Sequence, residues 1–274
     1  DFELAKYQQL CAALDIAGVG RVCFWTGGSL WIGHTSGRTA PHAHHAIQVS
    51  LALDDGGSFF LGEPGEPEVE RRAAIVVPRL RHRFDGRGGT VAQVFTEPET
   101  ALGHALLERF PGTRVQPLPL EVVSGPARAL GEAFHRGEDD EALVRLARDL
   151  AGRLAGASHA QPPVSSRIEA VIDHLAAVKG APVSLAQAAA LVHLSPGRFR
   201  HLFVAETGTT FRAYALWVRI QHAIGAMMAG RSWTEAAHDA GFADSAHLSR
   251  TFRRMFGVSP TMIVREENRA ARRK

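Results

Sequence analysis

The chain has 274 residues, with 45% hydrophobic and 22% charged side chains and a formal net charge of +3. This length exceeds that of a usual single domain, so two domains are expected, and the composition is that of a folded globular protein. No apolar run reaches the roughly 18 residues of a membrane span, and the acidic start DFELAKYQQL does not resemble a signal peptide. Cys11 and Cys23 are too few for a disulfide framework or a Cys-rich zinc module. We therefore expect a reduced, cytoplasmic protein without a membrane partner.

The charges are distributed unevenly along the chain. Residues 165–274 hold 15 Lys and Arg against 8 Asp and Glu, a net charge of +7. The first 164 residues hold 16 against 20, a net charge of −4. A basic C-terminal part on an acidic remainder is typical of a protein whose C-terminal part binds a polyanion such as DNA.

The N-terminal part, residues 1–155, is predicted to combine strands and helices. From about residue 20 to 97, short apolar or alternating runs are separated by turn signals such as Asp54–Gly57 and Arg87–Gly89. Many short strands with Gly-rich turns predict a small barrel or sandwich. Helices are expected to follow over about residues 98–154.

One of these helices carries a leucine stripe, formed by Leu143, Leu146, Leu150 and Leu154. The stripe fits either packing on the chain's own barrel or a seam with a partner subunit, and the spacing is the same in both cases. We favour the partner seam, which predicts a homodimer. The helices of this region are then expected to transmit a signal to the C-terminal part.

The composition changes at residues 156–166, where small, polar and Pro-rich residues predict an exposed linker. Residues 167–274 are predicted to be all α-helical and internally repeated. Each copy, 184–203 and 232–252, has the pattern of a helix-turn-helix unit, with one additional residue in the second turn. The helix predicted between them over 210–229 is about 30 Å long, close to the ~34 Å between successive major grooves.

The second helix of each unit supplies the candidate DNA contacts. Ser195 and Asp244 are suited to cap these helices, and Pro196 is suited to the first helical position. Exposed side chains near the start of such a helix reach base edges in the major groove, where Arg pairs with guanine through two hydrogen bonds. The candidate DNA-binding residues are Arg198, Arg200, His201, Ser245, Ser249, Arg250 and Arg253.

Further residues of the two units share a recognisable pattern. They include Leu194-Ser195-Pro196, Phe199, Leu202-Phe203, Gly208, Ala240-Gly241-Phe242, Leu248-Ser249-Arg250, Phe252–Gly257 and Ser259-Pro260. With them the chain from about residue 166 to 265 resembles the DNA-binding domain of the AraC/XylS family of bacterial transcriptional regulators. It departs from that pattern at Gly197, where a larger contacting side chain is common, and at Ile263-Val264, where an aromatic is usual. The resemblance implies binding to a double-stranded DNA operator, a homodimer and, for an activator, contact with RNA polymerase.

Histidines cluster in two segments of the N-terminal part. In an extended segment His42, His44 and Gln48 fall on one face, opposite Ile47, Val49 and Leu51. In the second segment, His82 is expected to point inward while its arginine neighbours face solvent. The segments resemble the two cupin motifs, although Gln48 replaces a carboxylate and Leu80 replaces a glycine.

These histidines leave two kinds of site open. His42, His44 and His82, with Gln48 as a possible fourth ligand, are candidates for a Zn²⁺, Ni²⁺, Mn²⁺ or Fe²⁺ site. The same four residues are alternatively candidates for a metal-free effector pocket. His34 and His45 are expected at the solvated surface.

The fold class expected is therefore α+β and multidomain, with a cupin-like β-barrel and appended helices followed by an all-α double helix-turn-helix domain. The function expected is a sequence-specific DNA-binding regulator, not an enzyme, that senses a small molecule or a metal through the cupin-like domain. The alternatives are a cupin metalloenzyme fused to a DNA-binding domain, and a dimeric DNA binder that responds to no effector.

Overall fold

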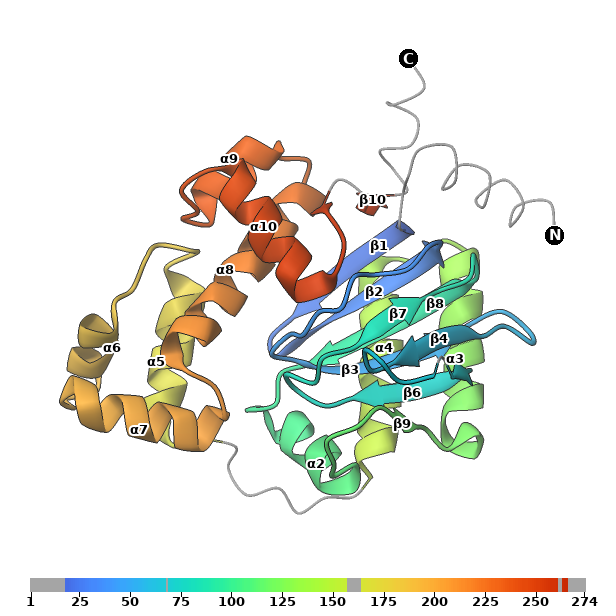
Figure 1. Cartoon of the computed structure of the whole chain (residues 1–274), viewed down its shortest axis with the longest axis horizontal. Helices are drawn as coiled ribbons and strands as arrows, with labels where there is room; N and C mark the ends of the chain where they lie inside the picture. The colour runs from blue at the N-terminus through green and yellow to red at the C-terminus, as the bar shows by residue number, and fades with distance from the viewer. Residues whose placement is uncertain (1–17, 68, 157–163, 261–262, 266–274) are drawn as a thin grey trace.

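The computed structural model describes residues 18–67, 69–156, 164–260 and 263–265. The strands are β1 (Gly18–Trp25), β2 (Gly28–Thr35), β3 (Ile47–Ala52), β4 (Phe59–Gly62), β5 (Glu70–Arg71), β6 (Ala73–Val76), β7 (Arg83–Asp85), β8 (Thr90–Thr96), β9 (Gln116–Pro117) and β10 (Ile263–Arg265). The helices are α2 (Ala101–Arg109), α3 (Leu120–His135), α4 (Asp140–Ala155), α5 (Ser166–Ala177), α6 (Leu185–Leu191), α7 (Pro196–Thr207), α8 (Phe211–Met228), α9 (Trp233–Asp239) and α10 (Ser245–Phe256). Figure 1 shows the strands and α2–α4 on one side of the molecule and α5–α10 on the other.

The N-terminal strands form two sheets rather than the expected barrel. The larger sheet has the order β10-β1-β2-β8-β3-β6-β9, and the smaller one has the order β5-β4-β7. No closed barrel is seen in the described part of the chain, because each sheet keeps two edge strands. Two isolated bridges, Arg38↔Asp85 and His42↔His82, lie outside the named strand pairs. Short strands separated by turns occur in both open and closed sheets. The sequence pattern alone therefore could not distinguish a barrel from two open sheets.

The helices α3 and α4 cover one face of the larger sheet (Figure 1). Strands alternate their side chains between faces, so Leu30 and Ile32 of β2 enter the same core cluster as Leu143 and Leu150 of α4. Both leucines of α4 are almost fully buried. The leucine stripe therefore packs on the chain's own sheet, and the expected partner seam is wrong for this surface. Helical periodicity predicts that the apolar face of a helix is buried, but it does not show whether the same chain or a partner buries it.

The C-terminal helices form the two expected helix-turn-helix units. Ser184 with Gln187 and Ser232 with Glu235 form complete capping boxes at the starts of α6 and α9. Ser195 accepts a hydrogen bond from the backbone at the start of α7, as expected, with Pro196 at the first helical position. Four residues separate α6 from α7 and five separate α9 from α10, which confirms the additional residue in the second turn.

The second unit lies against the face of the larger sheet that α3 and α4 leave open. Phe95 of β8 belongs to one core cluster with Trp217 of α8 and with Phe252 and Phe256 of α10. The C-terminal strand β10, which the sequence placed in the DNA-binding region, pairs in parallel with β1. Within the described ranges, no helix combines the length and the hydrophobicity of a membrane span.

Candidate nucleic-acid interface and effector site

The second helix of each unit, α7 and α10, presents its polar residues to solvent. Arg198, Arg200, His201, Arg250 and Arg253 are exposed, and Ser245 and Ser249 are half-buried. The apolar side of α7 is held by Phe199 and Phe203, and that of α10 by Leu248 and Phe252, all fully or almost fully buried. All seven candidate DNA-binding residues therefore keep exposed or partly exposed side chains on the second helix of each unit.

Each of these helices begins and ends at a defined residue. Asp244 accepts a hydrogen bond from the backbone nitrogen of His247 at 2.6 Å, which caps α10. Gly208 and Gly257 end α7 and α10 in the left-handed conformation, with φ of +68° and +73°, a conformation that favours glycine. The N-terminal caps at Ser195 and Asp244 fix the first turns, which in helix-turn-helix proteins enter the major groove.

The long helix α8 separates the two units. Its 18 residues correspond to about 27 Å at 1.5 Å per residue, near the ~34 Å between successive major grooves on one face of a duplex. Arg219 of α8 hydrogen-bonds the backbone carbonyls of Ala240 and Gly241, at the turn of the second unit. Its guanidinium also stacks on Phe242, 4.6 Å from the ring centre. Arg219 therefore joins α8 to the second unit, and its contacts are structural, unlike those expected of the exposed arginines.

Three of the histidines singled out in the sequence converge. His42 and His82 lie opposite each other in an antiparallel bridge and exchange both backbone hydrogen bonds, at 3.0 and 2.9 Å. The ring centres of His42 and His82 are 4.2 Å apart, and His44 lies 5.1 Å from His82. Burial lowers the pKa of His42 and of His44 to about 4, with His42 contributing to the shift at His44. Burial, and then the neighbouring His42 and His44, lowers the pKa of His82 well below its usual range, so the three imidazoles are neutral at pH 7.

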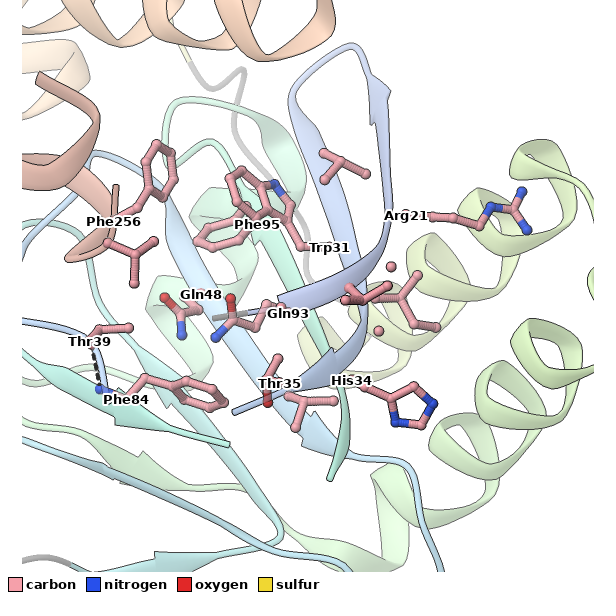
Figure 2. A pocket seen from close by; sticks show the side chains of 18 of the residues that line it. Arg21, Trp31, His34, Thr35, Thr39, Gln48, Phe84, Gln93, Phe95 and Phe256 are labelled. Carbon is pink, nitrogen blue, oxygen red and sulfur yellow. Dashed lines mark hydrogen bonds between the residues drawn. The ribbon is translucent and has the colours of Figure 1, made fainter. Parts of the chain in front are cut away.

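An apolar cavity of about 110 Å³ lies between the larger sheet and the end of α10 (Figure 2). Trp31 and Phe95 line it from the sheet, and Phe256 and Val258 line it from the second helix-turn-helix unit. Trp31 stacks on Phe256 with ring centres 4.9 Å apart. One wall of the cavity therefore belongs to the DNA-binding region itself.

The cavity holds part of the expected effector pocket. His42 and Gln48 are among its lining residues, together with the polar side chains of Gln93 and Thr39. The other two expected pocket residues are placed in the buried histidine cluster, where His44 Nε2 lies 2.8 Å from Gln48 Oε1. Gln48 is therefore shared between the cavity and the histidine cluster.

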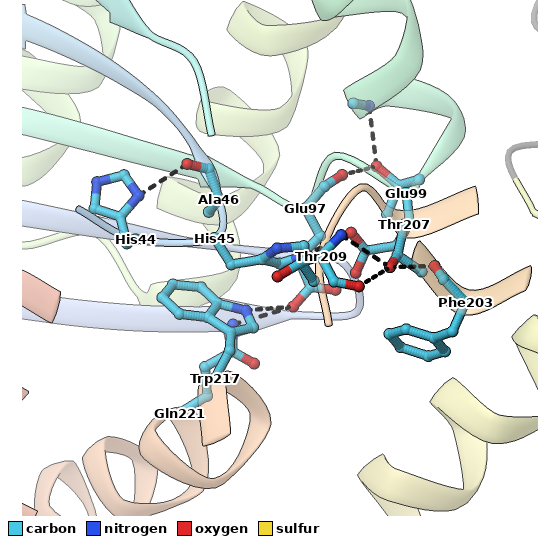
Figure 3. Close-up of polar contacts among 12 residues, drawn as sticks. His44, His45, Ala46, Glu97, Glu99, Phe203, Thr207, Thr209, Trp217 and Gln221 are labelled. Carbon is cyan, nitrogen blue, oxygen red and sulfur yellow. Dashed lines mark hydrogen bonds and ion pairs between the residues drawn. The ribbon is translucent and has the colours of Figure 1, made fainter. Parts of the chain in front are cut away.

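A second buried polar group joins the sheet to α8 (Figure 3). Trp217 Nε1 and Gln221 Nε2 both donate hydrogen bonds to Glu97 Oε1, at 3.2 and 3.1 Å. His45 Nε2 lies 2.8 Å from Glu99 Oε2, with both side chains buried. Burial raises the pKa of Glu97, and the nearby Glu99 raises it further.

Sequence reasoning missed this group. It placed His45 at the surface, yet His45 is buried because Tyr214 of α8 packs its ring at 5.2 Å. His34, also expected at the surface, is buried and interacts with Thr90 at 3.1 Å. The one available signal was Glu97-Pro98-Glu99, two carboxylates directly after a buried strand.

Two helix-turn-helix units joined by one helix, with exposed arginines on both second helices, define a helix-turn-helix DNA-binding region. Residues 188–266 match the helix-turn-helix domain family. The chain is 32% identical over 146 residues to the uncharacterized transcriptional regulatory protein YesN of Bacillus subtilis, covering 52% of this chain and 36% of that one. It is 26% identical over 195 residues to the transcriptional activator NphR of a Rhodococcus species, covering 70% and 50%.

The chain spans half or less of the length of these curated relatives. Both are named as transcriptional regulators, in agreement with the expectation of a regulator for this chain. Together with the helix-turn-helix match they support the AraC/XylS resemblance of the C-terminal region and indicate a DNA-binding regulator.

Among solved structures, the fold is similar to that of ToxT from Vibrio cholerae. The TM-score is 0.55 at 11% identity, with 86% of this chain and 96% of that chain covered. A second structure of ToxT, with an unsaturated fatty acid bound, gives a TM-score of 0.51 at 12% identity, covering 84% and 91%. The likeness extends over both the sheet region and the C-terminal helices, and it concerns the fold.

Proposed function

We propose that this protein is a transcriptional regulator that binds a specific double-stranded DNA operator and responds to a small apolar effector. The observation that carries the proposal is the pair of capped helices, α7 and α10, that expose arginines from two linked helix-turn-helix units. Arginine and lysine contacts to phosphates supply affinity without sequence preference, and side chains at base edges supply the choice of sequence.

The two units are proposed to read one duplex in adjacent major grooves. In the first, Arg198 and Arg200 are the candidates for base contact, and in the second Ser249 and Arg250. The net charge of +7 on residues 165–274 favours a polyanion, so affinity is expected to fall steeply with salt. A homodimer, and RNA polymerase for an activator, are further partners that the AraC/XylS resemblance implies.

The effector is proposed to bind in the cavity between the sheet and α10. A cavity of about 110 Å³ is slightly smaller than the roughly 150 Å³ apolar cavity that accommodates benzene in an engineered protein. We therefore propose a compound with one small apolar ring or a short apolar chain. Gln93 and Thr39 are available to hydrogen-bond a single polar group on it.

Because Phe256 lines this cavity at the end of α10, an effector there would contact the DNA-binding region directly. The signal is proposed to pass from the cavity to α10 at Phe256, which stacks on Trp31 of the sheet. This replaces the route through residues 98–154 expected from the sequence, since α3 and α4 cover the opposite sheet face (Figure 1). A ligand shifts such an equilibrium only if it binds the two arrangements with different affinity. ToxT, which shares the fold, has a structure with a bound unsaturated fatty acid.

DNA binding is tested by selecting sequences from a pool of random duplexes with the full chain. We expect enrichment of a motif with two blocks about 10 base pairs apart, one for each unit. Recovery of DNA without any enriched sequence would contradict the proposal.

Effector binding is tested separately, by thermal unfolding of the wild type and of Gln93→Phe in the presence of benzene. Benzene is expected to raise the unfolding temperature of the wild type and not that of the variant, because phenylalanine fills the cavity. An equal rise in both proteins would contradict binding at this site.

A further inference from the structure

The histidine cluster has an arrangement that packing alone does not require. Each ring places its Nδ1 atom on a backbone carbonyl two residues away in its own segment. His42 Nδ1 lies 2.9 Å from the carbonyl of Ala40, and His82 Nδ1 lies 2.9 Å from that of Leu80. His44 Nδ1 lies 2.8 Å from the carbonyl of Ala46. A carbonyl only accepts, so each ring carries its proton on Nδ1 and keeps a lone pair on Nε2.

The surroundings of Nε2 differ between His82 and His44. His82 Nε2 is buried and has no hydrogen-bond partner among the residues that the structure describes, although buried polar atoms are usually paired. His44 Nε2 lies 2.8 Å from the Gln48 amide, whose other end contacts the Ser50 hydroxyl at 2.9 Å. The structure places Gln48 Oε1 toward His44 and Gln48 Nε2 toward Ser50. With the His44 proton on Nδ1, a 180° turn of this amide would let its NH₂ donate to His44 Nε2 and its oxygen accept from Ser50.

We propose that His42, His44 and His82 bind one divalent transition-metal ion of the Zn²⁺ type through their three Nε2 atoms. One ligand atom from each histidine lies within 4.8 Å of the other two. Nitrogens about 2.1 Å from a tetrahedral ion lie about 3.4 Å apart, so ring nitrogens up to 4.8 Å apart must move closer together to bind one ion. Three histidines with water in the fourth position form a known type of zinc site.

The surroundings of the cluster favour a metal over a purely structural role. Histidines that bind metals almost always donate their other ring N–H to a carbonyl or carboxylate, which fixes the tautomer and the ring orientation. All three rings here have that carbonyl partner before any metal is bound. Neutral imidazoles without a carboxylate suit Zn²⁺, Cu²⁺ or Ni²⁺ better than Mg²⁺ or Ca²⁺, which prefer oxygen ligands.

The site also touches the DNA-binding region. The backbone nitrogen of Ala40 donates a 2.8 Å hydrogen bond to the carbonyl of Gly257, which ends α10. A methyl group at Gly257 would lie 2.6 Å from His42 Nδ1, so the loop and the end of α10 are in close contact. A metal that fixes His42 would therefore fix the loop that holds α10. This consequence for DNA binding rests on the proposed function, whereas metal binding itself does not.

The test uses the full chain without a histidine tag, titrated with Co²⁺ and with Zn²⁺. We expect one equivalent of Co²⁺ to give the intense visible absorption of a tetrahedral ion, and one equivalent of Zn²⁺ to displace it. The variants His82→Gln and His42→Gln are expected to lose at least 10-fold in Zn²⁺ affinity. His238→Gln is the matched control, because its side chain is 92% exposed, and it is expected to bind as the wild type does.

Two results would overturn the proposal: no tetrahedral Co²⁺ spectrum and no Zn²⁺ uptake by the wild type, or unchanged Zn²⁺ affinity in both cluster variants. The wild-type titration decides the first without any variant having to fold. For the second result, thermal unfolding of each variant shows that the variant whose Zn²⁺ affinity is measured is folded. Zn²⁺ binding without a change in DNA affinity would leave the metal site standing and contradict only its link to DNA binding.

Discussion

Trp217 Nε1 donates a 3.2 Å hydrogen bond to Glu97 Oε1, and this contact joins the middle of α8 to the end of β8. Gln221 donates to the same oxygen at 3.1 Å. Glu97 lies in the sheet region and Trp217 in the helix between the two DNA-binding units (Figure 3). The contact between the two regions therefore combines an apolar cluster with a buried carboxyl group.

Replacing Glu97 with glutamine is expected to stabilise the protein at alkaline pH. Burial, and then Glu99, raises the pKa of Glu97 in the folded state above its unfolded value. Its contribution to stability is thus complete below the unfolded pKa of about 4.3 and is lost as the pH rises through the folded pKa. Glutamine keeps an oxygen for Trp217 and Gln221 and never ionises.

The measurement is thermal unfolding of the wild type and of Glu97→Gln at pH 5 and pH 8. We expect the variant to gain unfolding temperature relative to the wild type at pH 8, and to gain less at pH 5. His45, Glu99 and Tyr214 are the other titratable groups beside it and are the same in both proteins. A variant that is equally destabilised at both pH values would contradict the ionisation argument.

Truncation of Phe256 is expected to weaken the contact between α10 and the sheet. Phe256 is 7% exposed and stacks on Trp31, and removal of a buried phenylalanine side chain typically costs about 3–5 kcal/mol. Urea unfolding of Phe256→Ala should show a loss of this size. Phe24→Ala is the control, since Phe24 is 36% exposed and should change stability by less than about 1 kcal/mol. Equal effects of the two substitutions would argue against this packing.

Substitution of Leu143 distinguishes packing of the leucine stripe on the chain's own sheet from packing on a partner subunit. Leu143 is fully buried against the chain's own sheet, so Leu143→Ala should lower the free energy of unfolding by about 2–5 kcal/mol. The oligomeric state, measured by light scattering after size exclusion, should not change. Leu191, at 44% exposed, provides a control substitution with a small effect. A Leu143→Ala protein of unchanged stability but smaller assembly would restore the partner seam.

The sequence predicted local features well and failed where distant segments meet. The repeat, the caps at Ser195 and Asp244 and the exposed arginines depend on residues a few positions apart, and they were predicted. The convergence of His42 with His82 was also predictable, since strand parity directs both inward. In contrast, the burial of His45 depends on α8, more than 160 positions away. Sheet closure likewise depends on edge strands that no short pattern specifies.

DNA recognition by the exposed face of α10 is tested most directly by the affinity of Arg250→Ala for the selected duplex. Arg250 is exposed on α10, so its loss should leave the fold intact. We expect specific binding to weaken by about 1–3 kcal/mol and selectivity to relax at the contacted base. Arg145→Ala, an exposed arginine of α4, is the control and should bind as the wild type does. Wild-type affinity and selectivity in Arg250→Ala would contradict the claim.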